Sequence, residues 1–272
     1  MPELPEVQTI VSELEKEIIG KKIAEVKILD KKVFQGDAHK VIGKKISDVS
    51  RRAKLILIKL DDFFLAIHLK LTGQLIYLPA KKEGFDKFKR AVLIFSDNSR
   101  LIFNDLRRFG WIKILSDEQV AKIKQDFGPE PLDKDFTLDK FKALLSKRLN
   151  AQIKPLLLDQ KFVAGIGNLY SDEILFYAGI HPKRKAKELT SEEVRKLYEG
   201  IKRILKEALK YKGSSIDTYR RTTGEKGNFE SHRKVYRRKG ERCKNCGGLI
   251  DAIKFGNRTS YFCPVCQPLT KK

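Results

Sequence analysis

The first twenty residues carry an amphipathic pattern. After Pro5, apolar residues from Val7 to Ile18 recur at helical spacing, and Gly20 follows where a C-cap is expected. The pattern predicts an N-terminal helix with one buried face.

From Ile23 to Ile114 the pattern changes to short runs that alternate or are wholly apolar. Turn signals such as DD, TG and SDNS separate these runs at the spacing expected of a β-sandwich. The runs are IAEVKI, LILIKL, FFLAIHL, QLIYL, AVLIF, RLIFN and WIKIL. This part of the chain is therefore predicted to be a mainly β domain behind a leading helix.

The stretch FGPEPLDKDFT then interrupts any regular element, because its prolines and glycine cannot continue a helix or a strand. Helical patterns follow over residues 138–149, 153–160, 169–178 and 191–211, and Thr190 or Ser191 can cap the last one. The stretch from Gly213 to Gly240 is polar and basic, and part of it is expected to be a mobile loop. The fold class is thus α+β.

Charge narrows the possible partners. The 272 residues contain 57 Lys and Arg against 35 Asp and Glu, a net charge of +22. Such an excess favours a polyanionic partner, with nucleic acid as the first candidate and a merely solvated basic surface as the alternative. Between Tyr211 and Cys246, eleven basic residues face four acids. This clustering favours a footprint for phosphates.

The apolar runs are too short and too often interrupted by charge for a membrane span. The N-terminus has no basic segment followed by an apolar one, so no secretory signal is predicted. We expect a cytoplasmic protein that associates with the nucleoid through DNA. Nothing in the sequence suggests more than a monomer.

The four cysteines form two C-x2-C pairs, Cys243 with Cys246 and Cys263 with Cys266, separated by sixteen residues. Each pair can offer two thiolates to one ion, and the spacer is long enough for a hairpin, so the pattern predicts one Zn²⁺. A redox pair or two disulfides are the alternatives. Four thiolates leave no open position on the ion, so the zinc is expected to be structural. It should hold a hairpin from Leu249 to Phe262, with Arg258 near the tip.

The opening residues MPELPEV place Pro2, Glu3 and Glu6 close together. Taken alone, they suit helix initiation, because Pro5 fits a first helical turn and acids there complement the helix dipole.

Five motifs in order resemble the formamidopyrimidine-DNA glycosylase family: PELPEV, HLKLTG, DLRRFG, LLLDQKFVAGIGNLYSDEIL and GNRTSYFCPVCQ. The resemblance covers essentially the whole chain. It implies a β-sandwich, a helix–two-turn–helix motif and a β-hairpin zinc finger. The implied activity is excision of oxidised purines from damaged double-stranded DNA, followed by cleavage of the abasic site.

Two other interpretations stay open. An enzyme of the related endonuclease VIII branch would act on oxidised pyrimidines, although that branch usually has Gly-Pro where this chain has Leu-Pro. A DNA-binding protein of the same fold would lack catalysis, although Pro2, Glu3 and Lys54 are intact.

In the resembled enzymes the N-terminal proline attacks the sugar C1′ and forms a Schiff base. An α-amino group has a pKa of about 8, so a usable fraction of Pro2 is unprotonated at neutral pH once Met1 is removed. Glu3 is placed to transfer protons, and Glu6 belongs to the same site or to the helix start. Lys54 resembles the basic residue that holds a phosphate, behind Ala53 in place of the family's usual glycine.

The remaining assignments concern the extruded nucleotide. Leu71, Arg107 and Phe109 match the trio that fills the gap in the duplex, although Leu71 and Phe109 also suit an ordinary strand core. Asn168 is expected at a helix start, where backbone N–H groups can hold a phosphate. Further backbone contacts are expected from the following residues: His68, Lys154, Tyr236 and Arg258.

The resemblance divides the chain into residues 1–128, a linker at 129–135, a helical domain at 136–240 and a zinc finger at 241–272. The loop at 213–232 is expected to cap the lesion. Asp217 stands in this loop where the family usually has arginine, so the lesion preference is the least determined part of the function.

Overall fold

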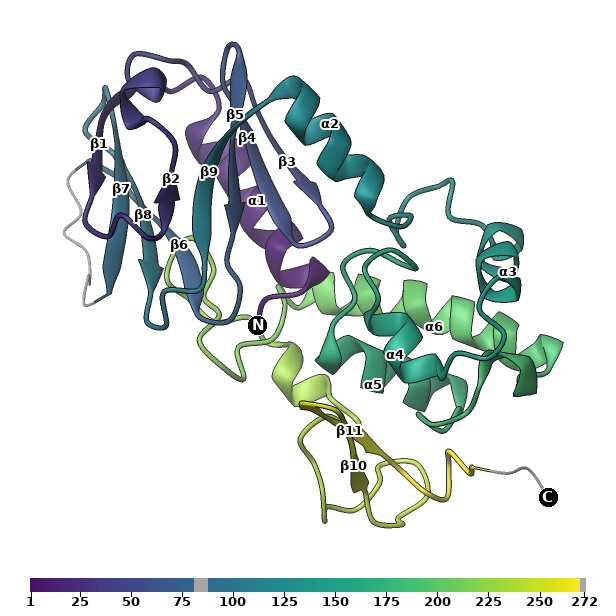
Figure 1. Cartoon of the computed structure of the whole chain (residues 1–272). Coiled ribbons are helices and arrows are strands. Elements are labelled where there is room, and N and C mark those ends of the chain that lie inside the picture. Colours follow the sequence, from purple (N-terminus) through teal and green to yellow (C-terminus); the bar gives the residue numbers. More distant parts are fainter. Residues whose placement is uncertain (81–87, 270–272) are drawn as a thin grey trace. The chain divides into compact units, whose positions relative to one another are not determined.

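The computed structural model describes residues 1–80 and 88–269, and the chain divides into two compact units (Figure 1). Unit 1 comprises Met1–Asp126 together with Ala208–Glu230, and unit 2 comprises Phe127–Glu207 together with Ser231–Lys272. Residues 208–230 lie within the helical domain at 136–240 that the resemblance implies. The structure instead groups them with the β-sandwich, because their side chains and backbone bond to the N-terminal helix and its neighbours.

Unit 1 contains two sheets among the residues that the structure describes. The larger sheet has the order β2 (Phe34–Gln35), β9 (Trp111–Ser116), β5 (Phe63–His68), β4 (Leu55–Lys59) and β3 (Asp48–Arg52). The smaller sheet has the order β1 (Ile23–Ile28), β7 (Lys89–Phe95), β8 (Arg100–Asp105) and β6 (Gly73–Leu78). The seven strands predicted from the sequence are present. The short β2 and the polar β3 were not predicted, because neither has an apolar run.

Helix α1 (Leu4–Ile18) contributes its apolar face to the main core of unit 1 and lies beside β3 (Figure 1). Residues of both sheets complete that core. Helix α2 (Asp117–Asp126), which the sequence analysis missed, packs Val120 against Leu55 and Leu57 on the other face of β4. Because β4 is buried on both faces, its first four residues, LILI, are continuously apolar instead of alternating.

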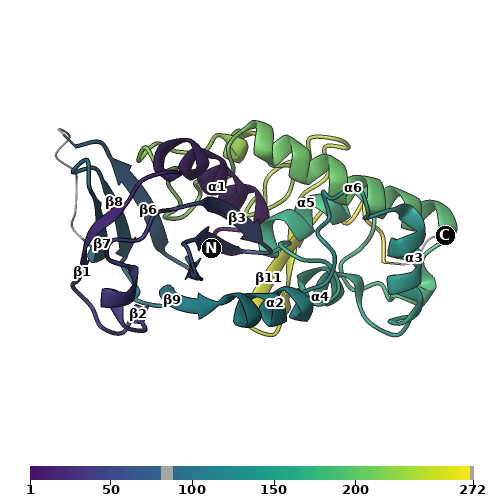
Figure 2. The same ribbon diagram turned by 90° about the horizontal axis from the view of Figure 1, so that it is seen from above.

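Unit 2 contains α3 (Leu138–Ser146), α4 (Ile153–Leu158), α5 (Asn168–Ala178) and most of α6 (Ser191–Lys210). Helix α5 lies between α4 and α6 (Figure 2), and it also contacts β11. Thr190 caps α6, since its hydroxyl accepts the Glu193 N–H while the Glu193 carboxylate accepts the Thr190 N–H. The hairpin of β10 (Asp251–Phe255) and β11 (Arg258–Phe262) completes the unit, as predicted.

Short 3-10 turns occur at Ala38–Val41, Ala186–Glu188 and Phe229–His232. No helix among residues 1–80 and 88–269 is long and apolar enough to cross a membrane.

Candidate active site and nucleic-acid interface

Pro2 and Glu3 are buried immediately before α1, and Met1 is exposed. Glu3 is the residue that precedes the first turn, and its N–H donates to Glu6 Oε2 at 2.7 Å. Glu6 therefore stabilises the helix start, as the local pattern predicted. Its second oxygen, Oε1, accepts the Ser214 N–H at 2.8 Å. The Glu6 carboxylate thus joins the N-terminus to the segment expected to cap the lesion.

That segment is fixed to α1 at its other end as well. Glu13 Oε1 accepts from Arg221 Nε at 2.6 Å, and Glu13 Oε2 accepts the Thr222 N–H at 3.0 Å. Between these anchors Tyr219 is buried in the core of unit 1. Burial raises the pKa of the Tyr219 phenol, and the negative charges of Glu6 and Glu13 raise it further. Residues 213–222 are consequently a strap with two ends bonded to α1.

Gly213 shows why the strap begins with glycine. Its φ is +77°, and a Cβ at this position would lie 2.7 Å from Glu6 Oε1. A larger residue would displace the Glu6 carboxylate from the contact with Ser214.

Lys54 lies in the turn between β3 and β4, where Arg52 pairs with Leu55. Only Ala53 and Lys54 connect the strands, and Ala53 has a φ of +52°. A two-residue hairpin turn of this kind favours glycine at a positive φ, which explains the glycine expected here from the resemblance. The Lys54 side chain is 7% exposed.

His68 ends β5, and its pKa is lowered to about 3 by burial and by the positive charges of Lys70 and Lys54. Its Nδ1 accepts the Lys70 N–H at 3.0 Å, so the proton of the neutral ring is on Nε2. His68 can therefore donate a hydrogen bond to a phosphate but carries no charge at neutral pH.

The expected gap-filling residues lie on two loops that share one buried carboxylate. Asp105 Oδ2 accepts the Gly110 N–H at 2.7 Å, and Asp105 Oδ1 accepts the Arg107 N–H at 3.1 Å. The Thr72 hydroxyl donates to the same carboxylate. Asp105 has no exposed surface, and it fixes the loop of Leu71 to the loop of Arg107 and Phe109.

The exposure of these loops favours the gap-filling role over the core alternative for Phe109. The Phe109 side chain is 51% exposed, and the Arg107 guanidinium lies 4.8 Å from the centre of its ring. Leu71 is half-buried. An aromatic ring held outside the core beside a cation suits insertion into stacked bases.

Lys154 does not lie where the sequence analysis placed it. Its side chain has no exposed surface. Its Nζ donates to Asp172 Oδ1 at 2.6 Å, to Ser171 Oγ at 2.7 Å and to the Asn168 carbonyl at 2.9 Å. The ammonium therefore donates three hydrogen bonds within unit 2, and this arrangement favours a structural role for Lys154 over the expected direct contact with DNA phosphate. Sequence spacing could not show that a helix with few charges would turn this lysine inward.

Asn168 begins α5, as predicted, with Gly167 as the preceding cap residue. Its Nδ2 donates to the Thr259 carbonyl at 2.8 Å, which connects the start of α5 to β11 of the zinc finger. The start of the helix is therefore close to the hairpin that carries Arg258.

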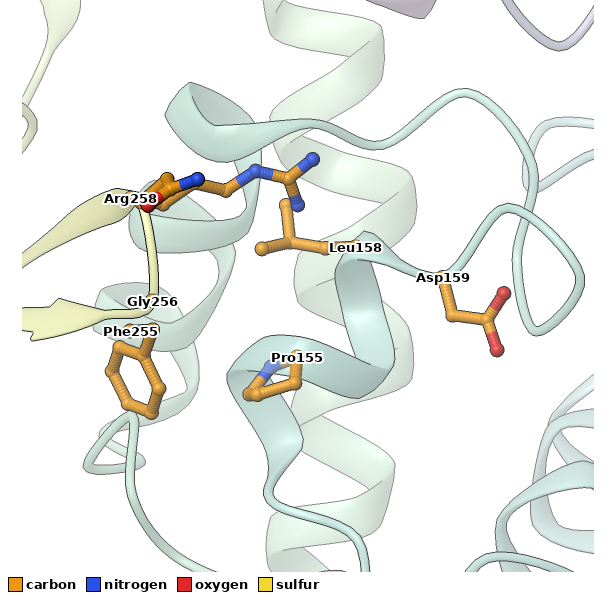
Figure 3. A pocket seen from close by; sticks show the side chains of 7 residues that line it. Pro155, Leu158, Asp159, Phe255, Gly256 and Arg258 are labelled. Atoms are coloured by element: carbon orange, nitrogen blue, oxygen red, sulfur yellow. The ribbon is translucent and has the colours of Figure 1, made fainter.

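Arg258 is exposed at the first position of β11. Pro155, Leu158, Asp159 and the turn Phe255–Arg258 line an open cleft between α4 and the hairpin (Figure 3). In this view the Arg258 side chain extends toward Leu158, while the Asp159 carboxylate points away from it. Among the side chains drawn there, the guanidinium is thus presented at the cleft and the Asp159 carboxylate is not directed at it.

Tyr236 is half-buried, and its ring meets Tyr261 edge to face at 5.4 Å between centroids. The buried Glu173 carboxylate of α5 accepts the backbone N–H groups of Lys234, Val235 and Tyr236 at 2.8, 3.1 and 2.9 Å. Burial raises the pKa of Glu173, and the three hydrogen bonds oppose that rise. Glu173 therefore fixes the turn that presents Tyr236.

The four cysteines converge at one point. Their Sγ atoms all lie within 4.8 Å of one another, with 3.8 Å between Cys243 and Cys266 and 3.5 Å between Cys246 and Cys263. Tetrahedral Zn²⁺ with Zn–S bonds of about 2.3 Å requires S–S separations of about 3.8 Å. Backbone N–H groups of Asn245 and Cys266 point at Cys243 Sγ and Cys263 Sγ. The donor set fits one structural zinc ion.

Four carboxylates of the site were missed from the sequence: Glu13, Asp105, Asp172 and Glu173. Each is buried or nearly so and accepts backbone or side-chain donors from a segment distant in sequence. A signal existed for the α5 pair, because two consecutive acids interrupt an otherwise apolar helix, NLYSDEILFYA. No comparable signal marks Glu13 on the outer part of α1.

Three family models match the chain. Residues 1–112 match the N-terminal domain of formamidopyrimidine-DNA glycosylase, and residues 127–220 match its H2TH domain. Residues 240–269 match the zinc finger found in FPG and IleRS.

Curated relatives and solved structures agree with these matches. The formamidopyrimidine-DNA glycosylase of Herpetosiphon aurantiacus is 39% identical over 98% of this chain and 100% of its own length. That of Streptococcus pneumoniae is 38% identical over 98% and 99%. A Lactococcus lactis FPG mutant in complex with Fapy-dG containing DNA matches with a TM-score of 0.90 at 37% identity, covering 98% of this chain and 100% of that one. The Lactococcus lactis Fpg complex with abasic-site DNA matches at 0.89 and 36%, covering 98% and 99%. The chain belongs to the formamidopyrimidine-DNA glycosylase family.

Proposed function

We propose that this chain excises oxidised purines from duplex DNA through a Schiff base at Pro2 and then cleaves the abasic site by β,δ-elimination. Its family consists of DNA glycosylases that also act as abasic-site lyases. The observation that carries the proposal is the buried Pro2–Glu3 pair at the start of α1 in a chain that matches the family over its full length.

The substrate class is inferred from the relatives. Structures similar to this chain hold DNA with Fapy-dG, N7-benzyl-Fapy-dG or an abasic site. These are an oxidised or ring-opened purine and the product of its excision. The Leu-Pro that follows Glu3 also favours this branch over the pyrimidine-specific one.

The proposed chemistry begins at the terminal nitrogen. With Met1 removed, the Pro2 nitrogen attacks C1′ of the extruded nucleotide, the base leaves, and an iminium forms between nitrogen and C1′. The buried Glu3 protonates the sugar ring oxygen as the ring opens and assists the later eliminations. Glu6 stabilises the start of the helix that positions both residues.

The remaining residues hold the distorted duplex. Lys54 and Arg258 are the charged phosphate contacts of the proposal, and His68 donates as a neutral group. Leu71, Arg107 and Phe109 occupy the gap, with Arg107 facing the orphaned base. Asn168 and Tyr236 complete the backbone contacts, while Lys154 acts indirectly by fixing α5 to the zinc finger.

Borohydride trapping on duplexes that carry 8-oxoguanine, an oxidised pyrimidine or an abasic site tests the proposal. We expect a covalent complex with the 8-oxoguanine and abasic duplexes, and none from a form that retains Met1, because its Pro2 nitrogen is an amide. Trapping by the Met1-retaining form would refute Pro2 as the nucleophile. Preferential trapping on the oxidised pyrimidine would favour the endonuclease VIII-like alternative, and binding without any trapping would favour the non-catalytic one.

We also propose that the protein acts in the cytoplasm, associated with the nucleoid through its basic surface. The net charge of +22 supports association with DNA.

A further inference from the structure

Asp217 lies at the tip of the strap formed by residues 213–222, beside the N-terminus. Its Oδ2 is 3.6 Å from the amino nitrogen of Met1. Both groups belong to unit 1.

The strap leaves little freedom in where its tip lies. Its first end is bonded to Glu6 and its second end to Glu13. Near the tip, the Thr218 carbonyl accepts from the Gln74 side chain, and the Thr218 hydroxyl donates to the Leu71 carbonyl at 3.4 Å. The position of Asp217 is therefore a property of the folded unit.

Removing Met1 moves the terminal nitrogen by one residue, to Pro2. Successive backbone nitrogens are separated by no more than about 3.8 Å. With Asp217 Oδ2 at 3.6 Å from the Met1 nitrogen, the Pro2 nitrogen lies within about 7 Å of the same carboxylate.

The sign of the charge at this position is unexpected. The family resemblance predicts arginine, which would repel a cation at the terminal nitrogen, whereas this chain has a carboxylate. A secondary amine forms a Schiff base that is necessarily cationic, because its nitrogen has no proton left to lose. The reaction at Pro2 therefore creates a permanent positive charge within Coulombic reach of Asp217.

We propose that Asp217 is the electrostatic partner of the terminal nitrogen and stabilises the iminium formed at Pro2. With an abasic site, the Pro2 N–H adds to the C1′ aldehyde, and the resulting carbinolamine takes up one proton and loses water. The N–C1′ bond gains double-bond character, and the nitrogen becomes positive. The carboxylate favours this cation over the neutral carbinolamine. This inference rests on the proposed function of Pro2.

Asp217→Asn tests the inference on an abasic-site duplex, which contains no damaged base for the strap to recognise. A unit charge at about 7 Å contributes a factor of about 3 for an effective dielectric constant of 80 and about 60 for one of 20. We expect Asp217→Asn to lower the borohydride-trapped fraction of bound complexes by a factor within this range. We expect Asp217→Arg to lower it further. The difference from the unchanged protein should narrow as salt rises, because ions screen the interaction.

Asp62→Asn provides a matched control. Asp62 is an exposed carboxylate that pairs with Lys44 in a turn of the same unit, so its loss changes the net charge equally. Affinity for a tetrahydrofuran duplex, which cannot form an iminium, gives the bound fraction for each variant.

Equal trapping by Asp217→Asn, Asp62→Asn and the unchanged protein would overturn the inference. The inference would also be overturned if Asp217→Glu, which keeps the carboxylate, trapped as little abasic DNA as Asp217→Asn. If the unchanged protein itself traps no abasic DNA, the proposed function of Pro2 fails first, and the two failures are thereby distinguished.

Discussion

Lys154→Met is expected to destabilise unit 2 without removing a phosphate contact. The substitution keeps the length of the side chain but deletes the ammonium that pairs with Asp172 at 2.6 Å. Asp172 has no exposed surface, and removing one partner of a buried ion pair typically costs about 3–5 kcal/mol.

The cost of protonating Asp172 gives a second estimate of this destabilisation, with the same magnitude. Asp172 can avoid an uncompensated charge by binding a proton, which at pH 7 costs about 4 kcal/mol for a carboxyl with an ordinary pKa near 3.9. Burial already raises the pKa of Asp172, and Lys154 opposes that rise. In the variant the pKa of folded Asp172 therefore lies above its unfolded value. The destabilisation is then largest at high pH and shrinks by about 1.4 kcal/mol per unit as pH falls from 7 to 5.

Urea unfolding followed by far-ultraviolet circular dichroism measures the loss, and Lys206→Met on the exposed face of α6 is the matched control. The control should change the free energy of unfolding by less than about 0.5 kcal/mol. Lys154→Met combined with Asp172→Asn should cost at least about 2 kcal/mol less than the sum of the single changes, because the pair is removed together.

DNA binding supplies the refuting measurement. If Lys154 contacted a phosphate, its removal would lower the magnitude of the log–log slope of affinity against salt by about one unit. Such a change in slope, with the free energy of unfolding unaltered, would refute the buried structural role.

Four further outcomes are expected. Because Lys154 is buried and His68 is neutral, Lys54 and Arg258 are the cations left among the expected phosphate contacts. These contacts should therefore contribute about −2 to the log–log slope of DNA affinity against salt. Arg258→Ala should reduce the magnitude of this slope by about one unit for every DNA sequence. An unchanged slope would exclude Arg258 as a phosphate ligand. The His68 pKa of about 3 lies below the ordinary value, so protonation favours unfolding, and stability should fall by up to about 1.4 kcal/mol per pH unit below pH 6.5. His68→Gln should lose this component in urea titrations at pH 5 and 7. Arg107→Ala should flatten the preference between opposite bases in excision assays, whereas an equal loss on every duplex would make it a phosphate contact. Cys243→Ser should release zinc, measured by metal analysis, and abolish DNA affinity while the Trp111 fluorescence of unit 1 is retained. Undiminished binding without zinc would contradict the structural role of the metal.

Local pattern was sufficient for most elements of this fold. The seven predicted strands, the helix after Pro5, the hairpin with Arg258 at its turn and the start of α5 at Asn168 all follow from periodicity and turn chemistry, which depend on neighbouring residues. The zinc ligands could also be predicted from the sequence, because each C-x2-C pair offers two thiolates to one ion by its local spacing. The elements that local pattern missed, β2, β3 and α2, are short or polar, and contacts with other segments hold them in place.

The roles of individual charges depended on the tertiary structure. Lys154 looks like any basic residue on a DNA-binding helix, and only the packing of α4 against α5 turns it toward Asp172. His68 is neutral because of burial and the positive charges of Lys70 and Lys54. Lys70 is two residues away in the sequence, but the burial and the approach of Lys54 depend on the tertiary structure. Part of the stretch from Gly213 to Gly240 was predicted to be a mobile loop, yet Glu6 and Glu13 of α1 bond to residues 213–222 across about 200 positions of sequence. Desolvation and long-range pairing determine what a charge does, and both exist only once distant segments have packed together.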